Sequence, residues 1–207
     1  MEASALTALR LYGVVAVDDG PVNSLAPGTS LISFRDLAAV VSPCAYEPVT
    51  EELPADYRRV VECVFRQQEI LPAPPGVVFR DQGVLLQWLE LHYFTLLDAL
   101  VFVEERAMAR ITIERPVEMS GGPPVDEADE IALQDSLRLL RHQSVATVGL
   151  GGEPHEPVRA VSFLVQQDRW ELFAELTRTE DARLEQHAFR LSGPWPPYDF
   201  VRMQFTS

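Results

Sequence analysis

Hydrophobic side chains recur along this chain with two different periods, and the periods predict which segments are strands and which are helices. Short runs in which apolar residues alternate or follow one another predict strands. Apolar residues spaced three and four apart predict helices with one buried face. The pattern predicts strands over residues 9–17, 30–34, 37–42, 76–79, 107–114, 158–166, 188–192 and 198–205, and helices over 56–68, 81–103, 126–148 and a segment that begins near Trp170.

Polar residues near the helix ends are expected to define where the helices begin and stop. Asp56 and Asp81 can each accept a hydrogen bond from an unpaired backbone N–H group of the first turn. Asp168 and Glu171 have the spacing of a capping box for the last helix. Gly149 is expected to end the third helix, because glycine readily adopts the left-handed conformation found there.

A run of glycine and proline divides the chain. Residues 116–124 include the sequence Gly-Gly-Pro-Pro at 121–124, which is typical of a linker. We therefore expect two small domains, an N-terminal one over 1–118 and a C-terminal one over 119–207. Both parts combine strands with helices that pack against an antiparallel sheet, which predicts the α+β fold class.

The charge of the chain limits the partners that it can bind. Its 207 residues include 31 acidic and 17 basic side chains, a net charge of -14, and 47% of the residues are hydrophobic. Such a surface repels phosphate groups, so we expect neither nucleic acid nor an anionic membrane as a partner. Every basic residue is arginine, which excludes a Schiff-base lysine and the lysine of a phosphate-binding loop.

No constellation of catalytic or metal-binding residues can be recognised. No histidine lies one helical turn from another, and none of the serines has the surroundings of a known nucleophile. We expect no enzymatic activity, no metal and no cofactor. Cys44 and Cys63 are too few for a disulfide framework, which fits a reducing cytoplasm. The histidines are His92, His142, His155 and His187.

The helix expected over 81–103 is apolar on more than one side. One interpretation is a helix buried between a sheet and another layer. The other is an apolar strip that binds a partner protein, because a large exposed apolar patch marks an interaction site. The candidate residues for such a partner surface are Trp88, Leu89, Tyr93, Phe94 and Leu97.

A second candidate is an aromatic and proline-rich motif near the C-terminus. Its prolines fix the backbone, so its aromatic side chains lose little entropy on binding. The motif can bind a partner, or it can be an internal anchor in which Trp195 packs the last part of the chain onto its own domain. Its residues are Gly193, Pro194, Trp195, Pro196, Pro197, Tyr198 and Phe200.

The sequence GPWPPYDF at 193–200 resembles the C-terminal motif of the gas vesicle GvpF/GvpL family, usually met as GPWPPYSF. Residues 11–15, 36–42 and 160–165 resemble further segments of that family in the same order. Residues 71–79 depart from the family pattern LPLRFGTVF, because Pro74 and Pro75 replace its arginine and phenylalanine. The chain is also short for the family, which is consistent with a divergent member.

The resemblance implies a ferredoxin-like N-terminal domain and a function in gas vesicle assembly. It implies that the protein assists nucleation of the shell in a chaperone-like manner, by binding the hydrophobic shell protein of the GvpA type and other accessory proteins. It also implies a cytoplasmic protein associated with gas vesicles. The alternative is a diverged protein-binding module of the same fold with another assembly or regulatory role.

Overall fold

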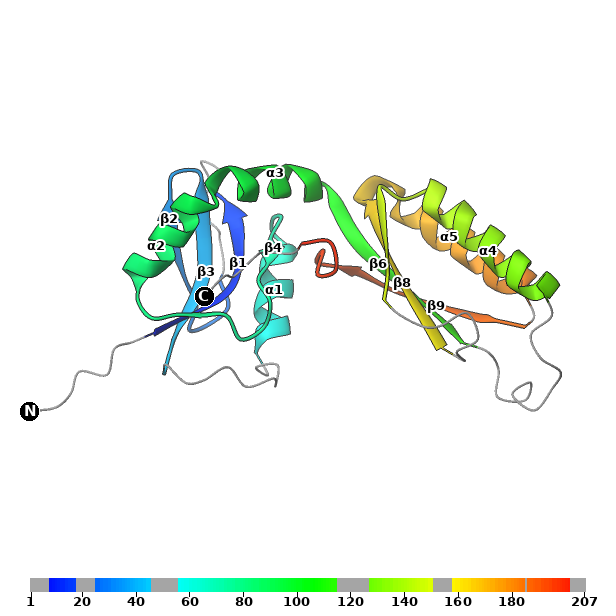
Figure 1. Cartoon of the computed structure of the whole chain (residues 1–207), viewed down its shortest axis with the longest axis horizontal. Helices are drawn as coiled ribbons and strands as arrows, with labels where there is room; N and C mark the ends of the chain where they lie inside the picture. The colour runs from blue at the N-terminus through cyan, green and yellow to red at the C-terminus, as the bar shows by residue number, and fades with distance from the viewer. Residues whose placement is uncertain are drawn as a thin grey trace, which may run out of the picture. The chain divides into compact units, whose positions relative to one another are not determined.

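The computed structural model contains two compact units (Figure 1). The first consists of Met1–Glu104 and Pro196–Ser207, and the second is Glu105–Trp195. Each unit combines an antiparallel sheet with helices, so the α+β prediction is confirmed. The structure describes residues 8–17, 25–45, 56–114, 127–150, 158–184 and 186–201.

The first unit is built on a sheet with the strand order β2-β3-β1-β4, in which β5 also pairs with β1. All of these pairs are antiparallel. The strands are β1 (Ala8–Ala16), β2 (Ser30–Phe34), β3 (Leu37–Cys44), β4 (Leu71–Pro72) and β5 (Val78–Phe79), and the helices are α1 (Tyr57–Phe65), α2 (Gln82–Leu91) and α3 (Tyr93–Val103).

Helices cover this sheet on both faces. Successive side chains of a strand point to opposite faces, so β3 contributes to two separate clusters. Leu37, Ala39 and Val41 pack with α2 and α3, whereas Ala38 and Val40 pack with α1. This double burial explains why β3 reads as an uninterrupted apolar run instead of an alternating one.

The second unit has the sheet order β7-β8-β6-β9, with α4 and α5 along one face (Figure 1). Ile111 and Phe163 from the sheet pack with Leu133 of α4 and Phe173 of α5. The elements are β6 (Arg106–Glu114), α4 (Glu127–His142), β7 (Ala146–Gly149), β8 (Val158–Gln166), the 3₁₀ turn η2 (Gln167–Arg169), α5 (Trp170–Arg183) and β9 (Ala188–Trp195).

The boundary between the units lies before β6, whereas the sequence analysis expected it at residue 118. Strand β6 pairs with β8 along its whole length, from Arg106 opposite Gln166 to Glu114 opposite Val158, and its other edge pairs with β9. A strand belongs to the sheet with which it forms hydrogen bonds, so β6 is part of the second unit. The Gly-Gly-Pro-Pro run lies outside the described residues.

Three predicted elements differ from the structure. The helix expected over 81–103 is broken at His92 into α2 and α3, which are bent by 72°. The helix expected over 126–148 ends at His142, and β7 follows because the next residues pair with β8. The strand expected over 198–205 begins as a turn, and residues 202–205 lie outside the described part of the chain.

The predicted caps have mixed outcomes. The Asp81 carboxylate accepts a hydrogen bond from the Val84 N–H at 2.9 Å and caps α2 as expected. Asp56 stands at the start of α1 but does not cap it, because its carboxylate accepts a hydrogen bond from the Tyr12 hydroxyl at 2.8 Å. No side chain caps α5, and Gly149 lies in β7 instead of ending α4.

Candidate functional site

The five predicted residues of the apolar partner surface are divided between the core and the protein surface. Leu89 and Tyr93 are buried against the sheet, and Trp88 and Leu97 are partly buried beside them. Only Phe94 is strongly exposed, at 76%. The interpretation as a buried helix therefore holds for one side of this segment. Another side is exposed apolar surface, and its binding of a partner protein stays a prediction.

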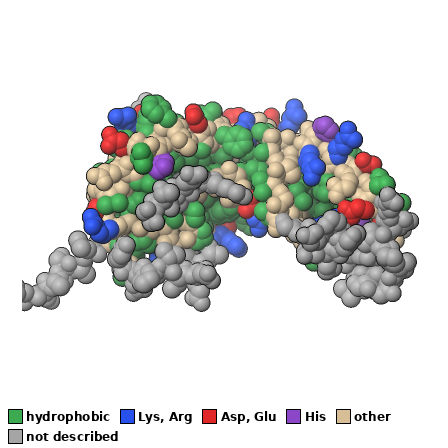
Figure 2. All heavy atoms as spheres, in the orientation of Figure 1, with side chains coloured by type: hydrophobic (Ala, Val, Ile, Leu, Met, Phe, Trp, Pro, Cys, Tyr) green, Lys and Arg blue, Asp and Glu red, His purple; other side chains and the backbone are tan. Residues whose placement is uncertain are grey.

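The exposed side of α2 and α3 includes apolar residues that the sequence analysis did not select. Leu91, the last residue of α2, is 78% exposed, and Val101 of α3 is 66% exposed. Phe94, Leu97 and Val101 are spaced three and four residues apart, so they follow one stripe of α3. We call these three residues the α3 ridge. Figure 2 shows hydrophobic side chains at the surface over α2 and α3.

The α3 ridge begins on a rigid aromatic base. The Phe94 ring packs edge-on against Tyr93, with ring centroids 5.2 Å apart. The Tyr93 hydroxyl donates a hydrogen bond to Asp36, which raises the pKa of the tyrosine. The Arg35 guanidinium lies over the same ring, 5.1 Å from its centroid. These contacts hold the Tyr93 ring against which Phe94 packs.

The first half of the aromatic motif completes the second sheet. Trp195, the last residue of β9, lies opposite Met108 of β6 and is half-buried. Gly193 has φ +129°, and a Cβ atom there would lie 2.7 Å from both the Met108 carbonyl oxygen and the Trp170 ring. Only glycine tolerates such a close approach, which accounts for its place in the motif.

The second half of the motif belongs to the first unit. Pro196 and Pro197 are buried. The Tyr198 ring packs against Tyr57 of α1, and Tyr57 stacks on Tyr12 of β1 with centroids 6.3 Å apart. Burial, together with the nearby Glu62 carboxylate, raises the pKa of Tyr198 to about 12. This packing favours the interpretation of the motif as an internal anchor, and its role in partner binding stays a prediction.

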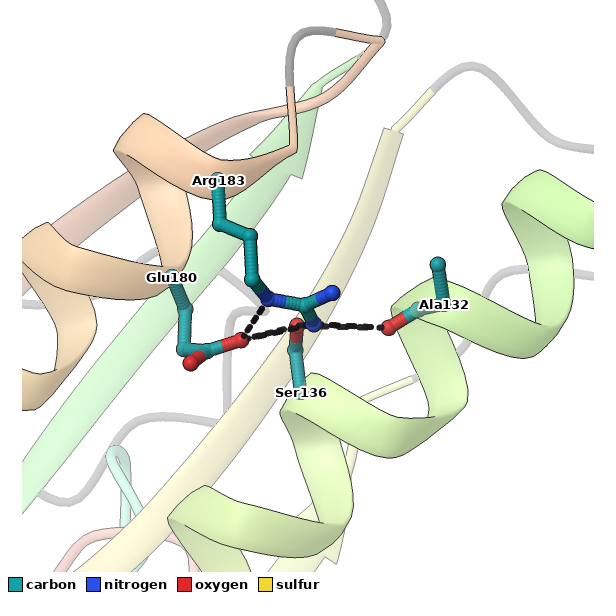
Figure 3. Close-up of polar contacts among 4 residues, drawn as sticks. All are labelled: Ala132, Ser136, Glu180 and Arg183. Atoms are coloured by element: carbon teal, nitrogen blue, oxygen red, sulfur yellow. Dashed lines mark hydrogen bonds and ion pairs between the residues drawn. The ribbon is translucent and has the colours of Figure 1, made fainter.

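A polar cluster between α4 and α5 was missed by the sequence analysis (Figure 3). The Ser136 hydroxyl donates a hydrogen bond to the Glu180 carboxylate at 2.6 Å. The Arg183 guanidinium donates to both residues, at 2.9 Å to Glu180 and 2.7 Å to Ser136. Ser136 is fully buried, so substrate cannot reach its hydroxyl. The cluster therefore fixes the two helices relative to one another, and Ser136 lies 44 residues before Glu180, so the three residues form no sequence motif.

Comparison with known proteins identifies the family. The model of the gas vesicle synthesis protein GvpL/GvpF family matches residues 8–120 and 124–202. The chain belongs to the GvpL/GvpF family. Comparison with curated protein sequences gives no significant match.

Solved structures of GvpL/GvpF family members share the fold. The crystal structure of the gas vesicle protein GvpF from Anabaena sp. PCC7120 is 14% identical, with a TM-score of 0.78, and the match covers 96% of this chain and 100% of that chain. The crystal structure of GvpF from Microcystis aeruginosa is also 14% identical, with a TM-score of 0.70, and the match covers 95% of this chain and 100% of that chain. The fold is thus retained at low sequence identity.

Membership of the GvpL/GvpF family makes this a gas vesicle protein. Pro74 and Pro75, which depart from the family pattern, are exposed between β4 and β5. In the described part of the chain, no group of three or more His, Cys, Asp or Glu side chains is placed to hold a metal. There too, no single helix is long and apolar enough to span a membrane, although the bent pair of α2 and α3 together reaches that length and composition.

Proposed function

We propose that this protein assists assembly of the gas vesicle shell by binding the hydrophobic shell protein, of the GvpA type, through the exposed side of α2 and α3. The observation that carries the proposal is the exposure of Leu91, Phe94 and Val101 on helices whose opposite side is core. Exposed apolar side chains that share one surface are typical of a protein-binding site. Aromatic residues held rigidly in such a surface are frequent anchors of binding.

The acidic composition supports a chaperone-like role at this surface. A shell protein with a very apolar face aggregates unless that face is covered before assembly. A partner that covers the face and displays many carboxylates keeps the complex soluble, because Asp and Glu favour solubility more than Lys or Arg. The net charge of -14 suits this task. Complexes with other gas vesicle accessory proteins belong to the same proposal.

Co-expression with the cognate shell protein, followed by pull-down, tests the proposal. We expect Phe94→Asp to abolish recovery of the shell protein, because a carboxylate would then stand at the start of the α3 ridge. Leu172→Asp is the matched control, since Leu172 is 57% exposed on α5 in the second unit. Equal recovery with both variants would refute the proposed surface. Failure of the unmodified protein to recover its shell protein would favour the diverged protein-binding module instead.

A further inference from the structure

One carboxylate lies within the α3 ridge. Asp98 follows Phe94 by four residues and precedes Val101 by three, so it shares their side of the helix. Its side chain is exposed, and no ion pair or hydrogen bond of Asp98 is found among the described residues. A partner that covers the α3 ridge therefore also covers a negative charge, or leaves it at the edge of the contact.

The segment of the chain around Asp98 contains acids and no arginine or lysine. From Asp81 to Glu105 the chain carries no arginine or lysine, and its one histidine in this range is His92. Glu90 is exposed on α2, and Glu104 is exposed directly after α3. Arg35 lies over the ring of Tyr93, the residue before Phe94. The exposed charges of this segment are therefore all negative.

A partner that fits this surface must compensate the charge. Removing a carboxylate from water without a counter-charge is unfavourable, so a purely apolar partner would bind poorly over Asp98. An arginine or lysine opposite Asp98 would offset the cost of removing the carboxylate from water, and it would fix the position of the partner along the ridge. The exposed acids on either side attract further cations and accelerate encounter with a basic partner.

We propose that the α3 ridge binds an amphipathic helix whose apolar stripe is flanked by arginine or lysine, with one cation opposite Asp98. This inference rests on the proposed function and specifies which segment of the partner is bound. A helix fits because side chains spaced three and four residues apart form a ridge that enters the groove of another helix. Phe94 and Val101 then contact the apolar stripe on either side of the ion pair.

The same charge argues against two other occupants. A second copy of this chain, related by a two-fold axis through the middle of the ridge, would bring its own Asp98 next to this Asp98, and like charges repel. An anionic lipid surface would be repelled by Asp98, Glu90 and Glu104 together. Neither occupant provides the cation that the surface requires.

Two synthetic helical peptides test the inference on the full-length protein. Both carry the same leucine stripe, and the flanking positions are arginine in one and glutamine in the other. We expect the arginine peptide to bind about fivefold more tightly at low salt, as an ion pair of about 1 kcal/mol would give. Asp98→Asn should remove most of this preference. The preference should also fall at 1 M salt, where charges are screened beyond about 3 Å.

The outcomes separate this inference from the proposed function. Equal binding of the two peptides, or a preference that Asp98→Asn leaves unchanged, overturns the inference even if Phe94→Asp abolishes recovery of the shell protein. A preference that depends on Asp98 supports the inference even if the shell protein is not recovered, and the partner is then another basic amphipathic helix. Binding of neither peptide also overturns it. Leu172→Asp should bind both peptides like the unmodified protein, and thermal melts confirm that each variant is folded.

Discussion

The ring of Tyr198 packs against the ring of Tyr57, with centroids 6.4 Å apart and the planes tilted by 42°. Tyr198 follows β9 in sequence, but its contacts are with α1 of the first unit. The Tyr57 hydroxyl in turn donates a hydrogen bond to the Ala73 carbonyl group, which ties α1 to the segment after β4. The second half of the aromatic motif, from Pro196 onward, is thus part of the packing of the first unit.

Tyr198→Phe tests the energetic role of this contact through its pH dependence. The pKa of Tyr198 is raised to about 12, chiefly by burial, and its hydroxyl is buried without a hydrogen-bond partner among the described residues. The folded state favours the neutral Tyr198 phenol. The stability that this preference contributes is complete below the unfolded pKa of about 10 and is lost as the pH rises towards 12. The variant should match the unmodified protein at pH 7 and lose less stability from pH 10 to 12.

Denaturant unfolding at several pH values measures this effect. Burial also raises the pKa of Tyr57, so the Tyr198→Phe variant should still lose some stability at alkaline pH. If both proteins lose the same free energy of unfolding from pH 10 to 12, Tyr198 ionises as freely in the folded state as in the unfolded chain.

Gly193→Ala should destabilise the protein strongly. The new Cβ would lie 2.7 Å from the Met108 carbonyl oxygen, and the residue would keep φ near +129°. Backbone strain alone costs about 1–3 kcal/mol. Gly149→Ala is the control in the same sheet, because nothing lies within 4 Å of a Cβ there. Chemical denaturation should show a change within about 0.5 kcal/mol for the control, and equal effects at the two positions would contradict the geometry.

Trp195→Ala should act mainly on stability. Trp195 is half-buried at the end of β9, so the loss should be smaller than the roughly 3–5 kcal/mol of a fully buried tryptophan. Thermal melts of the two purified proteins measure the change. An unchanged melting temperature combined with lost recovery of the shell protein would instead make Trp195 an interface residue.

Removing a member of the Ser136–Glu180–Arg183 cluster should destabilise the second unit. Ser136→Ala removes a hydrogen bond to a carboxylate that is 4% exposed, and such bonds contribute about 1.5–3 kcal/mol. Thr179→Ala is the control, since the Thr179 hydroxyl bonds only the exposed Glu175 carbonyl one turn earlier in α5. Urea unfolding should show a loss of at least about 1 kcal/mol for Ser136→Ala relative to this control, and similar losses would mean that the cluster adds little.

The acidic surface gives a prediction about solubility. Asp135, Asp168 and Glu171 are exposed in the second unit, away from the α3 ridge in the sequence and outside the first unit. Replacing them by their amides should leave this protein folded and soluble. In co-expression, the shell protein should still bind but should aggregate more, because the complex carries fewer charges. Unchanged solubility of the shell protein, measured by sedimentation, would remove the solubilising role from the proposal.

Much of the fold can be predicted from the sequence because local patterns determine it. The strands over 30–34 and 158–166 are found with the predicted bounds, since alternation and β-branched residues act within each segment. Asp81 caps its helix because the cap depends only on residues three positions apart. The family resemblance also followed from sequence alone, because the motif at 193–200 is a contiguous segment that can be read without the fold.

Tertiary packing decided the features that depend on residues far apart in the chain. The carboxylate of Asp56 binds the Tyr12 hydroxyl instead of its own helix, and no local pattern predicts a competitor 44 residues away. Residues 146–148 continue an apparent helix by composition, yet they lie in β7 because the edge of β8 offers hydrogen-bond partners. The apolar segment over 84–103 could not be divided into core and surface by sequence, because its apolar positions lie on more than one side of the helix. Contact with the sheet buries Leu89 and Tyr93 and leaves Phe94 in solvent, and this division defines the proposed binding surface.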